Sequence, residues 1–462
     1  TSILHICHFV EGLPLAIELA SAMTRLHSYQ EIWEKLSQGA IVLASNYRDI
    51  PSRHRSLDAV FDYSWQMLTE AQRHLLSICA LFPKTFTAHA AATIAAVPSE
   101  QLYLLADASL LKLLDGRRFE MHPLVQRYAL EKLQAQPEML ASAQQRFAHY
   151  YANLIESDGH ELLRSTAKFQ LLQRELINVH RSWHFAVQHR CLHELKKMGE
   201  GVMLCCLFQG PLHEGLQLLH LGVEAVCDDA PEALDAQSFN LYGSLLAAQL
   251  FLVVFQGEDE KFAELLHKTL PVVERMNERR LLSLVHFAMA WDAYSHSDLE
   301  AHHRHHEIGM QHAHACGYHC MVAVHLAHLA LGDALQRRIS QALDLLHQGF
   351  QILHTYGYEL LNGYLLSELG FVYMLAGELT LAFDTTEQAF QANQAINSTL
   401  NASWMFERMA LFSESAGNYP QSLIWAERAV AQNILIQNLE SLSSALLVRG
   451  RVRLVLGEML AA

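Results

Sequence analysis

The stretch Gly370–Ala389, GFVYMLAGELTLAFDTTEQA, contains the pattern that decides the fold. Its Gly377 belongs to a series of positions that recur at an unvarying 40-residue interval. The series consists of Gly257, Ser297, Arg337, Gly377, Gly417 and Gly457. A constant interval of this size is typical of stacked helical repeats, each unit being a helix–turn–helix pair. Such arrays present long binding surfaces, so a binding function is favoured over catalysis.

Small residues at fixed distances from these markers predict where the helices of a unit approach each other. They precede the marker by seven positions, or follow it by five or by twelve: Ala290, Ala330, Gly370, Ala410 and Gly450; Ala342, Ala382, Ser422 and Ala462; Thr269, Gly309, Gly349, Ala389 and Ala429. Apolar residues at helical spacing lie between them. The marker itself is expected to end the first helix and start the turn.

The composition of the whole chain is that of a globular protein. With 462 residues, of which 51% are hydrophobic and 18% charged, we expect two or three domains. The most apolar run, Leu245–Phe255, is interrupted by Gln249 and is too short to span a bilayer. The 8 cysteines include no CxxC pair, which favours a reducing, cytoplasmic location. Because the chain starts at Thr1 inside a helix-like pattern, we expect a missing preceding part.

The charge is unevenly distributed. Residues 1–150 contain 13 Lys/Arg against 14 Asp/Glu, and residues 151–462 contain 20 against 34. An acidic array repels a phosphate backbone. The expected recognition helix, Pro98–Ala108, lacks Arg, Lys and Asn. We therefore do not expect this chain to bind DNA directly.

The N-terminal part of the chain, 1–135, predicts helices followed by a small β wing. Thr69 is placed to cap a helix over Glu70–Phe82. Further on, an apolar run through Leu114, an Asp115-Gly116 turn and an alternating return describe a short hairpin. Helices followed by a two-stranded wing indicate a winged-helix domain.

Three strings make a family resemblance specific. GLPLAIELA (12–20), RHRSLDAVFDYSWQMLTEAQRHLL (53–76) and ADASLLKLLDGRRFEMHPLVQRYALEKL (106–133) occur in this order. Together they resemble the rear half of the signal-transduction ATPases with numerous domains (STAND). That group includes the NB-ARC ATPases and bacterial transcriptional regulators with tetratricopeptide repeats. INVHRSWHFAVQ (177–188) and GPLHEGLQLLHLGVEA (210–225) resemble the start of those regulators' repeat domain.

The resemblance implies a nucleotide-contacting role for four residues. Gly12, Leu13 and Pro14 match the GLPL segment, whose proline packs near the adenine in that family. His122 matches the histidine of the MHD motif, which reaches the phosphates of ADP. The third motif position is Pro123 instead of aspartate, so the resemblance does not extend to an aspartate-dependent contact. The alternative is that His122 only caps a helix or packs in the core.

The elements of an ATPase active site are not found in the sequence. It contains no GxxxxGK[ST] loop to hold phosphates, and no apolar strand ending in a pair of acids to hold magnesium. We therefore expect that this chain is not itself an enzyme. ADP or ATP would be a cofactor of the full-length protein only.

The repeats resemble tetratricopeptide units, although they follow a 40-residue interval instead of the roughly 34-residue one usual in that family. In that resemblance the first helix of each unit lines the concave face. Six residues there are candidates for binding a partner: Trp291, Tyr294, Tyr364, Phe371, Trp404 and Glu407. Aromatic side chains on a groove can anchor a peptide or helix. The alternative is that they pack inside the solenoid.

Histidines are concentrated at 302–320. On a helix, His302 and His306 share a face, as do His312 and Cys316, so zinc ligation is geometrically possible. Histidine is abundant along the whole chain, with 29 copies, and no acidic second shell is identifiable. We expect no metal site.

The sequence thus predicts a mainly α chain: a winged-helix domain with a small β wing, followed by an α-solenoid of tetratricopeptide-like helix pairs. The expected divisions are 1–50 (helical remnant of the ATPase module), 51–135 (winged helix), 136–200 (connecting helices) and 201–462 (repeat solenoid). The expected function is the regulatory and sensor half of a STAND-type ATPase in a bacterial transcriptional regulator. The array would bind an inducer or protein partner, and the winged helix would relay this to the nucleotide-binding domain. Oligomerisation is expected of the full-length protein, and membrane association is not. The alternative is a tetratricopeptide scaffold for protein–protein interaction without a nucleotide role.

Overall fold

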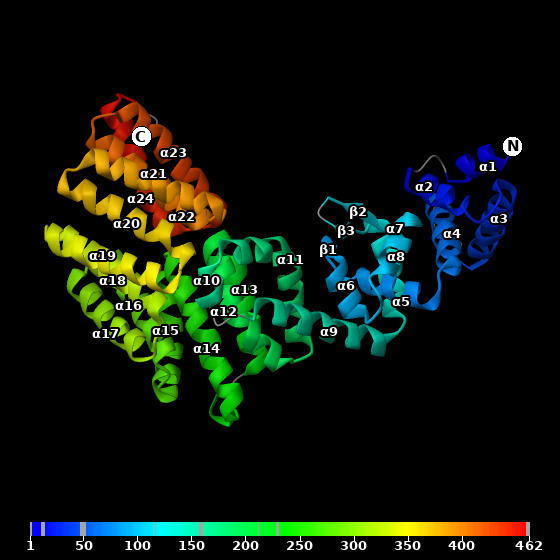
Figure 1. The fold of residues 1–462 in the computed structure, drawn as a ribbon, viewed down its shortest axis with the longest axis horizontal. Coiled ribbons are helices and arrows are strands. Elements are labelled where there is room, and N and C mark those ends of the chain that lie inside the picture. Colours follow the sequence, from blue (N-terminus) through cyan, green and yellow to red (C-terminus); the bar gives the residue numbers. More distant parts are fainter. Residues whose placement is uncertain are drawn as a thin grey trace. The chain divides into compact units, whose positions relative to one another are not determined.

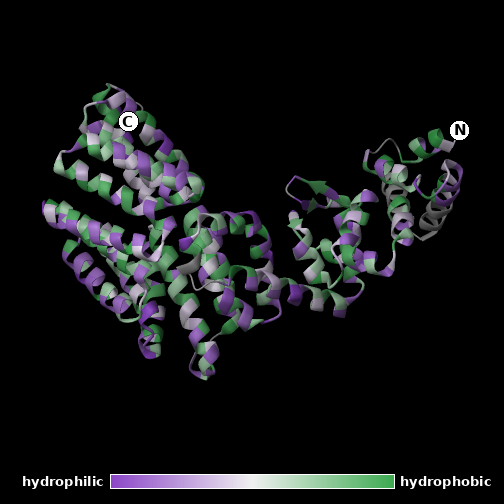
Figure 2. Cartoon of the chain, viewed as in Figure 1, coloured by the Kyte–Doolittle hydropathy of each residue, from purple (hydrophilic) through white to green (hydrophobic). Residues whose placement is uncertain are grey.

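A computed structural model describes residues 2–10, 14–46, 52–115, 117–156, 160–210, 212–227 and 231–458. Its residues form two compact units, Thr1–Leu154 with Ile177–His189, and Ile155–Leu176 with Arg190–Ala462. The fold is mainly α, as the sequence predicts. Most helices in Figure 2 display both hydrophobic and hydrophilic residues, which is expected where one face is buried and the other solvated.

The first unit begins with four helices and continues into a winged-helix domain (Figure 1). The four helices are α1 (Ser2–Phe9), α2 (Pro14–Met23), α3 (Tyr29–Asn46) and α4 (Ser52–Met67). The winged helix runs α5 (Glu70–Cys79), β1 (Thr85–Thr87), α6 (Ala88–Ala95), α7 (Glu100–Asp107), β2 (Lys112–Leu114), β3 (Arg118–Glu120) and α8 (Pro123–Gln134). As expected, Thr69 caps α5: its side chain accepts from Gln72 N–H and the Gln72 side chain accepts in return from the backbone of Thr69.

The sheet of the winged helix has one strand more than the sequence predicted. The order is β1-β3-β2, with both neighbours of β3 antiparallel to it. The pair β2 and β3 is the predicted hairpin. The β1 strand, Thr85–Thr87, is too short for a period-two pattern to be distinguished from a loop. Phe86 on β1 and Phe119 on β3 face each other in register and are fully buried.

After the winged helix come the connecting helices α9 (Pro137–Ile155), α10 (His160–Arg164) and α11 (Thr166–Gln188). Nearly all of α9 and the second half of α11 belong to the first unit, and α10 belongs to the second. The second unit continues with α12 (Leu192–Gln209) and α13 (Leu212–Val226). The helix pairs of the array come next. Their members are α14 (Ala236–Val253, extended by the 3-10 turn Val254–Gln256), α15 (Asp259–Met276), α16 (Arg279–Ser295), α17 (Leu299–Ala315), α18 (His319–Leu335), α19 (Ile339–Tyr356), α20 (Asn362–Ala376), α21 (Leu379–Ala395), α22 (Thr399–Ser415), α23 (Tyr419–Ile436) and α24 (Leu439–Val455). Even-numbered helices are the first of each pair.

Every 40-residue marker is the left-handed residue that ends the first helix of a pair. Gly377 has φ +86°, and the N–H of the next residue, Glu378, donates to the carbonyl of Tyr373 at 2.9 Å. The same bond follows Ser297, Arg337, Gly417 and Gly457, at 2.8–2.9 Å. This is the Schellman arrangement, which satisfies carbonyls left free at a helix end.

The structure also reveals a second series of left-handed residues midway between the markers. It consists of Asn277, Gly317, Gly357, Asn397 and Gln437, all with positive φ. The structural period is therefore half the marker interval and comprises one helix and its turn. Two such helices make one repeat of the sequence pattern.

The small residues lie at close helix contacts. At Gly370 of α20, an added Cβ would collide with the hydroxyl oxygen of Thr386 on α21. Ala382, Ala389, Ala410 and Ala429 are fully buried. Ala462 lies outside the described residues. Five positions after the marker the two earlier units depart from the pattern, because Phe262 and His302 stand where the later units have Ala or Ser.

One helix, Ala236–Gln256, is long and apolar enough to cross a membrane by length and composition alone. Within the structure 72% of its most apolar window is buried. This helix includes the run Leu245–Phe255, and it forms part of the core of the second unit.

Candidate functional site

The first helices of the pairs surround a cavity of about 650 Å³, which we call the central cavity. Its lining includes Trp291, Tyr294, Phe371, Trp404 and Glu407, which are five of the six residues predicted to bind a partner. They come from α16, α20 and α22. The other lining residues are Ser295, Ser297, Leu299, His328, Leu331, Leu335, Glu368, Arg408, Leu411, Glu440, Ser441, Ser443 and Ser444. Residues from several repeats, far apart in the sequence, thus meet around one space.

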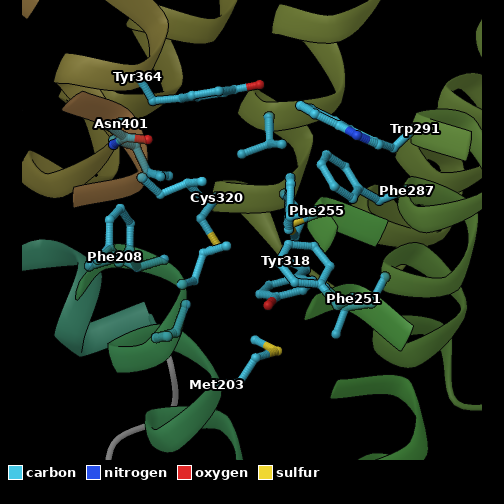
Figure 3. A pocket seen from close by; sticks show the side chains of 18 of the residues that line it. Met203, Phe208, Phe251, Phe255, Phe287, Trp291, Tyr318, Cys320, Tyr364 and Asn401 are labelled. Carbon is cyan, nitrogen blue, oxygen red and sulfur yellow. The ribbon is translucent and has the colours of Figure 1, made fainter. Parts of the chain in front are cut away.

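An apolar recess of about 80 Å³, drawn in Figure 3, is lined by aromatic side chains such as Phe255, Phe287 and Trp291. It shares Trp291 and Trp404 with the central cavity. Tyr364, the sixth predicted residue, lies on this recess together with Phe255 and Phe287. The two tryptophan rings are stacked, with centroids 5.7 Å apart. Both interpretations offered by the sequence therefore have a structural counterpart: these aromatic side chains pack on one another, and they also line a space.

The helix α24 closes the cavity, which the sequence did not predict. The Nε1–H of Trp291 donates to the Glu440 carboxylate at 2.8 Å, although 149 positions separate the two residues. The Nε1–H of Trp404 donates to the hydroxyl of Ser441 at 3.1 Å. A Cβ at Gly257 would lie 2.9 Å from the backbone nitrogen of Glu440. The helix α24 is thereby held against α16 and the turn at Gly257, which lie much earlier in the array.

The cavity is acidic. Arg408 is the one lysine or arginine among its described lining residues. Its guanidinium donates to the Glu368 carboxylate at 2.6 Å and to the carbonyl of Ser367 at 2.6 Å, and it lies 4.8 Å from the centroid of the Phe371 ring. This charge is therefore already matched by Glu368.

Two further carboxyl groups, Glu407 and Glu440, line the cavity beside this pair. Glu407 accepts a hydrogen bond from the hydroxyl of Ser444, and Glu440 accepts from Trp291. Burial raises the pKa of Glu407, and burial raises the pKa of Glu440 to about 7 although the Trp291 donor opposes this. For both acids, removal from water therefore outweighs the contacts that favour the ionised form.

Four buried histidines lie at or near the lining of the central cavity. They are His302 and His306 on α17, and His325 and His328 on α18. His328 lines the cavity, and its Nε2 lies 2.5 Å from the hydroxyl of Tyr364. Burial lowers the pKa of all four, to about 3 for His325, so they are neutral at physiological pH.

Three of these histidines could together hold a metal ion. The candidate ligand nitrogens of His302, His306 and His328 lie within 4.8 Å of one another. However, the rings of His306 and His328 are stacked with an interplanar angle of 10°, so their lone pairs lie in nearly parallel planes and do not converge on one point between the rings. Chelation would require a change of rotamer. The shared face of His302 and His306 is as predicted, and their burial was not foreseen.

Two of the four residues assigned to nucleotide contact, Pro14 and His122, are described, and both belong to the first unit. Pro14 is the first residue of α2 and is exposed; Gly12 and Leu13 lie outside the described residues. His122 is exposed and is the N-cap of α8, where its Nδ1 accepts from the N–H of Leu124 at 3.2 Å. The capping role considered for His122 is thus present, and it uses Nδ1 of the ring. The helix α7 contains Glu100 and Asp107 and no basic residue.

Comparison with known proteins gives partial matches. The chain is 36% identical over 162 residues to three mycobacterial proteins, each named "Putative HTH-type transcriptional regulator", one from Mycobacterium bovis and two from strains of Mycobacterium tuberculosis. The match covers 33% of this chain and 18% of each relative, so the chain corresponds to less than a fifth of their length. No family model matches the chain.

Among solved structures, the chain is similar to a STAND protein with a tetratricopeptide repeat sensor from Pyrococcus horikoshii. The likeness covers 97% of this chain and 74% of the other, with a TM-score of 0.39 and 16% sequence identity.

Proposed function

We propose that this chain is the regulatory and sensor half of a STAND-type signal-transduction ATPase in a bacterial transcriptional regulator. The repeat array binds an inducer or partner in the central cavity, and the winged helix transmits this event to a nucleotide-binding domain outside the chain. The observation that best supports the sensor role is the central cavity itself. Its volume of about 650 Å³ lies within the range of small-ligand sites. The matched mycobacterial regulators are consistent with a role in transcription.

A ligand in this cavity can alter the geometry of the array. The cavity is bounded by helices from repeats far apart in the sequence, α16 and α24 among them, and closed by hydrogen bonds between them, such as that from Trp291 to Glu440. A ligand that binds the closed form more tightly than an open one favours closure by its differential affinity. Coupling to nucleotide state then follows if the nucleotide biases the same equilibrium.

The nucleotide role of the winged helix rests on His122. Its Nδ1 is engaged at the start of α8, and the exposed ring is available to a phosphate from a domain docked there. Pro14 is likewise exposed. In this proposal ADP or ATP is a cofactor of the longer protein, the chain itself does not hydrolyse ATP, and the protein is cytoplasmic and active as an oligomer.

The test uses the longer protein that includes the upstream region. ADP affinity is measured by calorimetry for the parent, His122→Asn and His122→Ala. Asparagine is a good N-cap, so His122→Asn keeps α8 capped while removing the imidazole. We expect ADP affinity to fall by about tenfold or more in both variants, and a tenfold loss corresponds to about 1.4 kcal/mol of binding free energy. His89→Ala, at another exposed histidine of the winged helix, is the matched control.

Unchanged ADP affinity in His122→Asn would refute the relay. So would an upstream region without a phosphate-binding loop, and the tetratricopeptide scaffold would then be the better description.

A further inference from the structure

The central cavity combines three features that together specify the chemistry of a ligand. It has aromatic faces, it has more carboxyl than basic side chains, and it borders an apolar recess. Each feature occurs alone in many proteins. Their coincidence in one cavity of about 650 Å³ restricts what can bind there.

The charge balance favours a cation. Glu368, Glu407 and Glu440 line the cavity, and Arg408 is the single arginine or lysine among its described lining residues. Arg408 is bound to Glu368. His328 adds no charge at neutral pH, because burial lowers its pKa well below the usual value. The three carboxyl groups thus outnumber the one cation, so a cationic ligand, which favours the ionised forms of Glu407 and Glu440, is preferred over an anionic one.

The aromatic side chains stand next to these carboxyl groups. Trp291 donates to Glu440 directly, and its ring centroid lies 6.3 Å from that of Tyr294. Trp404 is stacked on Trp291 and belongs to the same helix as Glu407. An ammonium or guanidinium group is attracted to a ring face within about 6 Å, most strongly by tryptophan. A cation near Glu407 and Glu440 can thus contact both carboxylate and ring.

The site already contains one example of this chemistry. The guanidinium of Arg408 lies over the ring of Phe371 and on the carboxylate of Glu368. A second cation beside Glu407 and Glu440 would be held by the same combination of groups.

We propose that the central cavity binds a small organic cation, in which an ammonium or guanidinium group is attached to an apolar body. The cationic group lies between Glu407, Glu440 and the tryptophan faces. The apolar body contacts the leucines of the cavity wall, Leu299, Leu331, Leu335 and Leu411, or enters the adjoining recess. This proposal rests on the sensor function in so far as the ligand is its inducer.

The test measures binding of matched probes to the whole 462-residue chain. The probes are 2-phenylethylammonium, its neutral analogue 2-phenylethanol and the anionic 3-phenylpropanoate. Binding of each probe is measured by calorimetry and by tryptophan fluorescence. We expect the ammonium compound to bind about tenfold or more tightly than the alcohol, and the carboxylate not to bind. Equal affinity for the ammonium compound and the alcohol, or no binding of the ammonium compound at millimolar concentration, would overturn the proposal.

Charge-neutral variants identify the carboxyl groups responsible. Glu407→Gln and Glu440→Gln keep the shape of the side chains, and each is expected to weaken ammonium binding about tenfold while leaving the alcohol unaffected. Glu414→Gln is the control: Glu414 lies on α22 like Glu407 but pairs with Arg451 outside the cavity. Circular dichroism establishes that each variant is folded. Equal effects of all three substitutions would indicate long-range electrostatics and would contradict the assigned site.

Proton release is a second measurement that a purely structural role would not change. A cation placed beside Glu440 favours its ionised form, so binding near pH 7 releases protons, and the observed heat varies with the ionisation enthalpy of the buffer. This dependence should shrink in Glu440→Gln. No buffer dependence in the parent would place the cation elsewhere.

Two outcomes separate this proposal from neighbouring ones. Binding of an acetylated alanine-rich peptide with one lysine, without binding of the free amine, would overturn the small-molecule ligand in favour of a protein partner. Cation binding to this chain with no effect on ADP affinity in the longer protein would leave the site intact and refute the relay.

Discussion

The hydrogen bond between Trp291 and Glu440 provides a quantitative test of how the array is closed. Substitution of Trp291 by Phe removes the Nε1–H and leaves the Glu440 carboxylate with one donor fewer. Trp404→Phe is a matched control, since the Nε1–H of Trp404 donates to the neutral hydroxyl of Ser441 on the same helix, α24. Both substitutions remove the same atoms, so the loss of apolar contact largely cancels between them.

The expected difference follows from the charge of the acceptor. A hydrogen bond to a charged group contributes about 1.5–3 kcal/mol, and one between neutral groups about 0.5–1.5 kcal/mol. At pH 8 Glu440 is mostly ionised, because its pKa in the folded protein is about 7. Trp291→Phe should therefore destabilise the closed array by about 1 kcal/mol more than Trp404→Phe at this pH.

The difference should disappear on acidification. At pH 5.5 Glu440 is protonated in the folded state and the acceptor of Trp291 is then a neutral carboxyl group. The sign is fixed by the direction of the shift: a carboxyl whose folded pKa lies above its unfolded value stabilises the folded state as pH falls. Trp291→Phe and Trp404→Phe should then cost nearly the same.

The assay is native-state hydrogen exchange of the backbone amides of α24, which reports the free energy of opening this helix, at pH 8 and pH 5.5. Thermal melting of the two variants gives an independent comparison. Equal losses at pH 8, or a larger loss for Trp291→Phe that persists at pH 5.5, would refute the reasoning. The first result would mean that the Glu440 contact is not formed, and the second that its charge is not involved.

Three further predictions concern the stability of the array. Gly417→Ala should cost about 1–2 kcal/mol although an added Cβ meets nothing within 4 Å, because its φ is +75°; Gln437→Gly, at φ +57°, should gain stability, and both are measured by thermal melting. Gly370→Ala should cost about 1–3 kcal/mol from the clash with Thr386, and the double variant with Thr386→Ala should recover part of this. Acidification from pH 7 to 5 should cost about 2 kcal/mol for His325, whose folded pKa is about 3, because the unfolded state takes up the proton first. His325→Gln removes this contribution, so its melting temperature should fall less than that of the parent between pH 7 and pH 5. Protonation of Glu440 acts in the opposite direction in both proteins.

The sequence revealed the repeat because helix ends are decided locally. A Schellman turn needs a residue that tolerates positive φ, and glycine tolerates it best, so Gly377 and Gly417 recur at a fixed interval. The second series was missed because three of its members, including Asn277 and Gln437, are not glycine. Asparagine is the usual alternative to glycine at such helix ends, so Asn277 and Asn397 were the residues from which the second series could have been predicted.

The sequence also supported the choice of the first helices as the inner surface. Trp291, Phe371 and Trp404 were proposed from their place within a unit, and the structure puts them on one cavity. This succeeded because the same offset in each unit places a side chain on the same face of the array. Their function as ligand contacts stays a prediction.

Only the tertiary structure shows which residues from distant units meet. Nothing in the sequence indicated that Glu440 reaches Trp291, that Arg408 is matched by Glu368, or that four histidines are buried together. The physical reason is that each unit adds a small rotation, and only the sum of these rotations determines where the array curves back on itself. Local sequence therefore determined the helices, their ends and their inner faces. The long-range curvature decided that the inner faces enclose an acidic, aromatic cavity.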